Sequence, residues 1–238
     1  NGRCIYYWLG TDVLNTTIDN QHNRLNRYFL GRVRSGEHIC CAPWLADELT
    51  RLSIQANNLY MPLKLYENGP LAPLPDRFTV LTYIPDSKFA FYGGQEIVEA
   101  ARKMPEVNFV VVGGNGIWLT DRPENLKFLG WQSDMPSLYR NATVILRLVE
   151  HDAFGGNVLE ALLHGRHVVY SRRTPHSLYV PFGDCAALMN TLTNLKKLHD
   201  DSELELNVSG RDFILAEFHT KKLCNNLKGY LNGKRSSL

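Results

Sequence analysis

The sequence predicts an α/β fold built around parallel β-sheets. Short runs rich in β-branched and aromatic residues alternate with amphipathic helical patterns, and this alternation is typical of a parallel sheet flanked by helices. Several of the predicted strands are apolar throughout, as strands covered by helices on both faces should be. With 238 residues, of which 44% are hydrophobic and 21% charged, the chain is long enough to bury one large core or two small ones.

The individual elements follow from local patterns. A helix opens at "APWLADEL", directly after the second predicted strand. The segment 202–231 reads as two further helices, because its apolar residues recur at helical spacing. Those apolar residues are Phe213, Ile214, Phe218, Leu223 and Leu227. The predicted strands are 4–9, 38–42, 57–61, 78–83, 108–113, 126–129, 143–148 and 167–171.

A proline-rich segment divides the chain into two predicted domains. The run "PLKLYENGPLAPLPDR" holds four prolines and a glycine, which neither a helix nor a strand tolerates well. We place the boundary near Pro75, which gives an amino-terminal portion over 1–75 and a larger domain over 76–238. The first portion is shorter than the ~100 to 150 residues of a common domain. Because the chain also starts at Asn1 without a methionine, we expect a fragment whose first domain is incomplete.

Composition and charge exclude several classes of protein. The 26 basic and 24 acidic residues are interleaved, so the chain lacks the basic stripe of a DNA- or RNA-binding protein. No apolar run approaches the roughly 20 residues that span a bilayer, and no signal peptide opens the chain. The five cysteines are odd in number and include the adjacent Cys40 and Cys41, whose side chains would alternate across a strand. A disulfide framework is therefore not expected, and a reducing cytoplasm is favoured.

The segment 144–171 contains the residues with the clearest chemical meaning. It reads "VILRLVEHDAFGGNVLEALLHGRHVVYS", which predicts a strand, a glycine-bearing turn, a helix, a glycine stop and a second strand. Gly155 and Gly156 let the backbone approach a ligand where unpaired amides and the helix dipole favour a diphosphate. Glu160 lies one turn further on, where its carboxylate could accept hydrogen bonds from a ribose diol, and Asp152 precedes the turn. The alternative is an ordinary αβ unit with a solvated Glu160.

This segment resembles the donor-binding signature of retaining GT-B glycosyltransferases of the family-4 type, the glycosyl transferases group 1. That signature has two acidic residues separated by seven others, and this chain reads "DAFGGNVLEAL", with Asp152 for the usual first glutamate and Ala153 for a glycine. The resemblance implies a Rossmann-like, doubly wound donor domain at the carboxyl end and, here, a truncated α/β amino-terminal portion. It implies that Asp152 is catalytic and faces the donor sugar. The implied donor-binding residues are Gly155, Gly156 and Asn157 for the diphosphate and Glu160 for the ribose.

The resemblance covers roughly residues 78–171 and departs from the family at the diphosphate. Family members carry an arginine and a lysine early in this domain, whereas Thr82 and Tyr83 stand at the expected arginine position. Lys88, in the loop after the strand, and Arg147, just before the signature, are the candidate replacements. A solvated lysine is the alternative for Lys88.

Three further positions are candidates. Gly114, in the "GGNG" run, would approach the nucleotide, but the run lacks the third glycine and acidic partner of a dinucleotide fingerprint, so an NAD enzyme is disfavoured. Family members contact the base near Trp131, although a core tryptophan is the favoured interpretation here. Asp12 follows a strand that ends at Gly10. It is a candidate catalytic or orienting group on the acceptor side, with turn capping as the commoner role for such an aspartate.

The resemblance implies an enzyme that moves a sugar from a nucleotide-diphosphate sugar to an acceptor hydroxyl, with retention of configuration. The eight histidines show no metal spacing, and we expect no metal site and no cofactor beyond the donor. Relatives imply a glycan or lipid-linked acceptor, surface-polysaccharide assembly, and a cytoplasmic location with peripheral association at the inner face of the membrane. The alternatives are a catalytically incomplete nucleotide-sugar-binding module or subunit, and a nucleotide-sugar epimerase of GT-B fold. A first domain completed upstream of Asn1 would favour the transferase.

Overall fold

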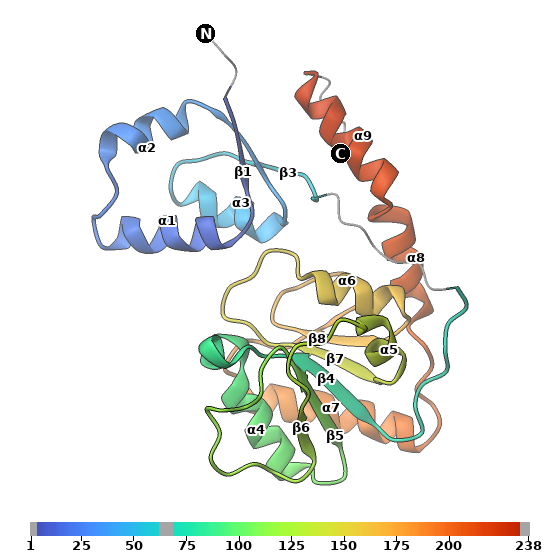
Figure 1. The fold of residues 1–238 in the computed structure, drawn as a ribbon. Helices are drawn as coiled ribbons and strands as arrows, with labels where there is room; N and C mark the ends of the chain where they lie inside the picture. Colours follow the sequence, from blue (N-terminus) through green and yellow to red (C-terminus); the bar gives the residue numbers. More distant parts are fainter. Residues whose placement is uncertain (1–3, 62–68, 234–238) are drawn as a thin grey trace. The chain divides into compact units, whose positions relative to one another are not determined.

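The computed structural model describes residues 4–61 and 69–233, and throughout them it shows helices packed on β-sheets (Figure 1). The chain forms two compact units. The first consists of Asn1–Lys64, His151–Phe154 and Glu217–Leu238, and the second of Leu65–Glu150 and Gly155–Ala216. Each unit has its own sheet, and every strand pairing among the described residues is parallel. The predicted α/β class is thereby confirmed.

The sheet of the second unit has six strands in the order β6-β5-β4-β7-β8-β9. They are β4 (Thr79–Tyr83), β5 (Asn108–Val112), β6 (Leu126–Phe128), β7 (Val144–Arg147), β8 (His167–Tyr170) and β9 (Leu178–Tyr179). The chain places β5 and β6 outward from β4 and then returns to place β7 on the other side of β4. In such a doubly wound sheet the carboxyl ends of the strands meet at one edge, and ligands bind where the strand order reverses, here between β4 and β7.

Helices cover both faces of this sheet (Figure 1). They are η1 (Asp86–Lys88), η2 (Ala90–Tyr92), α4 (Gly94–Lys103), α5 (Met135–Arg140), α6 (Gly156–Leu163), α7 (Cys185–Asp200) and α8 (Val208–Glu217). Helices α4 and α7 lie on one face, and α5 and α6 lie on the other. Ile97 of α4 and Leu188 of α7 pack with Val80, Phe109 and Val144 of the strands in one buried cluster. Burying each of the large apolar side chains stabilises the fold by about 1.5–3 kcal/mol.

The sheet of the first unit has three strands in the order β1-β2-β3. The elements of this unit are β1 (Ile5–Trp8), α1 (Thr11–Gln21), α2 (Arg27–Arg34), β2 (Glu37–Cys40), α3 (Pro43–Thr50), β3 (Asn57–Asn58) and α9 (Thr220–Leu231). Its core joins Val13 of α1 and Leu45 and Leu49 of α3 to Trp8 and Cys40 of the strands. The unit therefore has a small hydrophobic core of its own.

All of the predicted strands are present, most of them shorter by one or two residues at an end. The exception in length is β3, which keeps only two residues, Asn57 and Asn58. The structure adds β9, a two-residue strand at the edge of the larger sheet that is too short for an alternating pattern to reveal. Both predicted carboxyl-terminal helices are found as α8 and α9.

Residues 72–75 of the proline-rich segment, next to the predicted boundary, are bound to the second unit. The fully buried guanidinium of Arg166 donates to the carbonyl oxygen of Ala72 at 2.7 Å and to that of Pro73 at 3.0 Å. The Nε2 atom of His199 lies 2.8 Å from the carbonyl oxygen of Pro75. Because of these contacts the second unit starts before the boundary predicted near Pro75.

The carboxyl terminus also differs from the predicted division. Helix α9, which the sequence places in the second domain, is grouped with the first unit. The ring centroid of Phe218 lies 4.6 Å from that of Tyr60 and 5.2 Å from that of Phe154, and all three residues are in the first unit. Phe218 lies just before α9, and its contacts join segments far apart in the chain, which no local pattern reports.

The five cysteines are free thiols. None of the helices within residues 4–61 and 69–233 has the length and hydrophobicity needed to cross a membrane.

Candidate functional site

Helix α6 begins at the glycine pair, as the sequence predicts. Gly155 precedes the helix with φ −62° and ψ 120°, and Gly156 is the first helical residue. The helix ends at Leu163, and Gly165 follows with φ +69°, a left-handed conformation that favours glycine. The flanking strands β7 and β8 are parallel neighbours. The structure therefore has the predicted order of strand, turn, helix, glycine stop and strand.

The first turn of α6 is open and leaves backbone amides unpaired. Gly156 is exposed, and a Cβ added to it would meet no atom within 4 Å. No side chain caps the helix, and among the described residues no acceptor is found for the backbone N–H of Gly156 or Asn157. Within the same ranges the side-chain oxygen of Asn157 is buried without a hydrogen-bond partner. Unpaired amides at the positive end of a helix attract an anion, and a phosphate supplies the acceptors that they lack.

Glu160 lies one turn along α6, where a tyrosine holds its carboxylate. Tyr139 of α5 is 1% exposed, and its hydroxyl donates to Glu160 Oε2 at 2.8 Å. Burial raises the pKa of the Tyr139 hydroxyl, and the neighbouring Glu160 carboxylate raises it further, so the hydroxyl stays protonated and remains a donor. Glu160 is thus a half-buried, oriented carboxylate, which differs from the solvated side chain of the alternative interpretation.

Arg147 places a guanidinium at the carboxyl edge of the larger sheet. It is the last residue of β7, one of the two strands between which the strand order reverses. Its Cζ lies 5.2 Å from the centroid of the Tyr92 ring. Its charge also reaches Tyr139, whose pKa it lowers against the larger effects of burial and Glu160. Arg147 is therefore within electrostatic reach of the Tyr139–Glu160 pair, at the edge where a doubly wound fold binds its ligand.

Lys88 lies in η1, the turn that follows β4, and its side chain is exposed. The strand before it has no basic residue. Its Thr82 is buried, and the ring of Tyr83 packs against that of Tyr92 with 5.5 Å between centroids. Binding of a diphosphate by Lys88 or by Arg147 remains a prediction. Of the two, Arg147 is the one whose side chain the fold holds in place.

The glycine run 113–116 is folded against η1 by a single carboxylate. Asp86 accepts the backbone N–H of Asn115 and that of Gly116, both at 2.8 Å. A Cβ on Gly114 would lie 2.5 Å from the carbonyl oxygen of Ile84 and 2.8 Å from Asp86 Oδ1, so only glycine fits there. The run follows β5 at the carboxyl edge of the sheet, as predicted, and this packing already explains its glycine. Contact of Gly114 with a nucleotide stays a prediction.

Trp131 is not a core residue, so the favoured interpretation from the sequence is wrong. It is 79% exposed, and Ile117, in the adjacent loop, is 81% exposed. A bond of 2.8 Å from the N–H of Gly113 to the carbonyl oxygen of Gly130 joins the two loops. Strand β6 ends at Phe128 and the chain turns at Gly130, with φ +66°, which leaves the indole beyond the packed part of the sheet.

The two predicted catalytic carboxylates, Asp152 and Asp12, are both in the first unit. Burial, and to a smaller extent these two carboxylates, raise the pKa of the Cys41 thiol to about 11, so both lie within electrostatic reach of one buried side chain. The carbonyl oxygen of Asp152 accepts the indole N–H of Trp44 at 2.7 Å. The glycine pair and Glu160 belong to the second unit, and the role of Asp152 toward a donor sugar stays a prediction.

Asp12 lies in the first turn of α1, directly after the turn that follows β1. Its Oδ1 atom accepts the backbone N–H of Leu9 at 3.0 Å, of Gly10 at 2.8 Å and of Val13 at 2.9 Å. Gly10 has φ +114°, and a Cβ there would lie 3.0 Å from the Cβ of Ala153. Asp12 therefore caps the start of the helix, the commoner of its two predicted roles, and its catalytic role stays a prediction.

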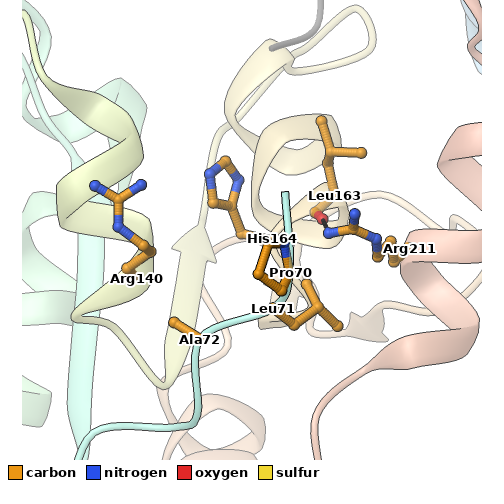
Figure 2. A pocket seen from close by; sticks show the side chains of 7 residues that line it. All are labelled: Pro70, Leu71, Ala72, Arg140, Leu163, His164 and Arg211. Atoms are coloured by element: carbon orange, nitrogen blue, oxygen red, sulfur yellow. Dashed lines mark hydrogen bonds between the residues drawn. The ribbon is translucent and has the colours of Figure 1, made fainter. Parts of the chain in front are cut away.

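A small pocket lies at the opposite end of α6 (Figure 2). Its lining residues are Pro70, Leu71, Ala72, Arg140, Leu163, His164 and Arg211. Arg211 reaches from α8 and donates to the carbonyl oxygen of Leu163 at 3.0 Å, and His164 Nδ1 lies 2.7 Å from the carbonyl oxygen of Glu160. These side chains pair the carbonyl groups that end α6, so the basic lining has a structural explanation.

Sequence reasoning missed Tyr139, Asp86 and Arg166, each of which acts on a partner far along the chain. Tyr139 stands in a short apolar helix, where an aromatic residue reads as core. Asp86 follows a strand in "IPDSK", and its place at the carboxyl end of a strand in a doubly wound fold is the one signal that could have marked it. Potential metal ligands are not gathered either, since no three His, Cys, Asp or Glu side chains come together in the described part of the chain.

A family model described as "Glycosyl transferases group 1" matches residues 92–197. The matched segment contains Trp131, Tyr139, Arg147, the glycine pair and Glu160. It therefore covers the open first turn of α6 and most of the polar groups around it. No curated protein sequence matches the chain.

Solved structures similar to the chain are GT-B glycosyltransferases. Anabaena Alr3699/HepE, in complex with UDP-glucose, has a TM-score of 0.75 at 16% identity, over 97% of this chain and 72% of that one. Sucrose-phosphate synthase from Thermosynechococcus elongatus has a TM-score of 0.73 at 16% identity, over 98% of this chain and 68% of that one. The lipopolysaccharide outer core galactosyltransferase WaaB has a TM-score of 0.71 at 11% identity, over 97% and 75%. At these identities the likeness establishes the fold, and the predicted GT-B fold is confirmed.

Proposed function

We propose that the chain is a glycosyltransferase that transfers a sugar from a nucleoside-diphosphate donor to an acceptor hydroxyl, since residues 92–197 match the family model of the group 1 glycosyltransferases and the fold is GT-B. The observation that carries the proposal is the open first turn of α6. Its unpaired amides at Gly156 and Asn157 lie one helical turn from the oriented carboxylate of Glu160. Amides suit a diphosphate, and a carboxylate suits the two hydroxyls of a ribose.

Two further groups support this assignment. Arg147 supplies a fixed positive charge at the sheet edge, which would stabilise the negative charge that develops on the leaving diphosphate. Trp131 offers an exposed indole beside the loop that bears Ile117, and an aromatic face of this kind is a stacking surface for a planar base. The proposed donor site therefore has a place for base, ribose and diphosphate on one unit.

In the proposed reaction the bond between the anomeric carbon and the diphosphate oxygen breaks, and a bond from that carbon to the acceptor oxygen forms. The proton of the acceptor hydroxyl leaves with the diphosphate or passes to solvent. We assign Asp152 to the donor sugar hydroxyls, and we take the transfer to be retaining and independent of a metal ion, with amides and Arg147 stabilising the leaving group. These assignments rest on the resemblance of "DAFGGNVLEAL" to the family signature.

The relatives suggest the setting in which to test the proposal. One is bound to UDP-glucose, and another is described as a galactosyltransferase of the lipopolysaccharide outer core. We therefore propose a nucleotide sugar as donor, with a UDP-sugar as the first to test. We also propose a glycan or lipid-linked acceptor in surface-polysaccharide assembly, at the cytoplasmic face of the membrane.

A nucleotide titration tests the donor site. UDP-, GDP-, ADP- and dTDP-glucose are added to the chain, and the melting temperature is followed in the wild type and in Glu160→Ala. We expect one nucleotide to raise the melting temperature. At a concentration one hundred times its Kd, that nucleotide should add about 2.7 kcal/mol to the free energy of unfolding. The variant should bind that nucleotide about 30-fold more weakly, because hydrogen bonds to a charged group contribute about 2 kcal/mol.

The matched control is Glu99→Ala, which removes a partly exposed helix glutamate of the same unit that pairs with Lys103 at 2.6 Å. This variant should bind like the wild type. If none of the four donors stabilises the wild type, or if both glutamate variants lose affinity equally, the proposed donor site is wrong. Binding without transfer to any hydroxyl acceptor would instead favour the incomplete binding module.

A further inference from the structure

Tyr139 carries a hydroxyl group into a buried position. The residue is 1% exposed, and its hydroxyl has one identified partner, Glu160 Oε2 at 2.8 Å. A phenylalanine would fill the same space without a hydroxyl to bury, and burying a hydroxyl costs free energy unless it is hydrogen-bonded. The tyrosine hydroxyl therefore points to a role in holding Glu160.

The fold aims this hydroxyl by fixing the short helix that bears it. Asp134 caps α5 by accepting the backbone N–H of Ser137 at 3.1 Å. The ring of Tyr139 packs on that of His164, with 5.3 Å between centroids. His164 in turn lies 2.7 Å, through Nδ1, from the carbonyl oxygen of Glu160. Side chain and backbone of Glu160 are thus both held by neighbours that are themselves packed.

The hydrogen bond from Tyr139 orients the Glu160 carboxylate without occupying all of its acceptor positions. A carboxylate has two oxygens and about four acceptor positions. Tyr139 occupies one position on Oε2, and among the described residues no partner is found for Oε1. A flexible glutamate would lose rotamer freedom when it accepts hydrogen bonds from the two hydroxyls of a ribose. A carboxylate that is already oriented avoids that loss.

We propose that Tyr139 is a positioning residue that orients Glu160 for the two ribose hydroxyls and thereby makes the site selective for ribonucleotides over 2′,3′-dideoxynucleotides. This inference rests on the proposed function, because it takes Glu160 as the group that meets the ribose. Tyr139 touches no substrate atom in this scheme and acts through Glu160 alone.

The test is the affinity of Tyr139→Phe for two ligands that differ only at the ribose. Isothermal titration calorimetry on the full chain compares UDP, or the diphosphate identified by the thermal titration, with its 2′,3′-dideoxy form. We expect Tyr139→Phe to weaken binding of the ribonucleotide by about tenfold and to leave the dideoxynucleotide nearly unchanged. In a Glu160→Ala background the same change should have no further effect on the ribonucleotide, because the group through which it acts is absent.

Tyr7→Phe is the matched control, since it deletes a tyrosine hydroxyl that donates to the carbonyl oxygen of Leu59 at 2.7 Å in the first unit. It should leave both affinities as in the wild type. Equal weakening of both ligands by Tyr139→Phe, no weakening of either, or a full additional loss in the Glu160→Ala background would each overturn the inference while leaving the proposed function intact. Absence of nucleotide binding by the wild type would overturn both.

Discussion

The side chains around the first turn of α6 differ in how firmly the structure holds them. Glu160 is fixed through Tyr139, Arg147 lies over Tyr92, and Lys88 projects from an exposed turn. Thr82 is buried at the position where an arginine was expected. At the scale of single residues, Arg147 is therefore the best placed replacement for the missing charge, because an anchored guanidinium loses less entropy on binding a diphosphate.

Replacing Arg147 by methionine should keep an apolar contact with Tyr92 and remove the charge. We expect the affinity for the cognate nucleoside diphosphate to fall about tenfold or more, since a charge-assisted hydrogen bond contributes about 1.5–3 kcal/mol. The remaining affinity should depend less on salt concentration than that of the wild type. Calorimetric titration at low and high salt measures both effects.

Arg173→Met is the control for that experiment. Arg173 also stacks on a tyrosine, with Cζ 4.1 Å from the centroid of Tyr179, at the edge strand β9. Its loss should change the affinity little. If the two arginine variants behave alike, Arg147 has no special part in binding the diphosphate.

At the scale of elements, loops and linkers are fixed by single charged side chains that bind backbone. Asp86 accepts hydrogen bonds from two backbone amides of the loop after β5. Arg166 donates hydrogen bonds to two carbonyl groups of the segment 69–75. Burial lowers the pKa of the Arg166 guanidinium to about 10, so it remains charged at neutral pH. Each is a point at which one substitution should release a whole segment.

Arg166→Met should destabilise the second unit, because it leaves the carbonyl groups of Ala72 and Pro73 without the donor that the buried guanidinium supplies. We expect the free energy of unfolding in guanidinium chloride to fall by about 2–4 kcal/mol. The control Arg102→Met removes an exposed arginine that pairs with Asp121 at 3.0 Å, and it should cost no more than about 0.5 kcal/mol. Losses of equal size in the two variants would show that Arg166 does not clamp the segment.

At the scale of the whole molecule, both units bury histidines whose neutral form the fold favours. Burial lowers the pKa of His38 in the first unit and of His164 and His167 in the second. The case of His38 is also geometric, because the indole N–H of Trp8 donates to its Nδ1 at 3.1 Å. That nitrogen must therefore be unprotonated in the folded chain.

Stability should consequently fall as the pH drops below about 6.5, the ordinary pKa of histidine. A pKa that is lower in the folded state means that the unfolded chain takes up the proton first, so stability is complete above this pH and decreases below it. The slope is at most about 1.4 kcal/mol per pH unit for each histidine. Denaturant unfolding between pH 7.5 and 5.5 measures it.

The variant His38→Gln keeps an acceptor for Trp8 and cannot titrate, so its stability should depend less on pH than that of the wild type. The control His176→Gln replaces an exposed histidine and should keep the wild-type slope. A steeper acid loss in His38→Gln than in the wild type would contradict the assignment.

The sequence by itself determined the parallel α/β class, the predicted strands, the helix that starts at Gly156 and the position of Glu160 one turn beyond it. These features are local. Hydrophobic alternation, glycine at a turn and helical spacing act over a few residues, and each segment carries its own signal. For the same reason the resemblance to the donor signature could be read from one continuous stretch.

Only the tertiary structure decided which side chains meet across the chain. It brought Tyr139 to Glu160 and Asp86 to the loop after β5, it grouped α9 with the first unit, and it left Trp131 exposed. Such contacts depend on how elements distant in sequence pack, and a residue type alone does not specify its partner. From the sequence alone, Tyr139 is indistinguishable from an ordinary core residue. The role proposed for its hydroxyl follows only from the fold, which places the Glu160 carboxylate beside it.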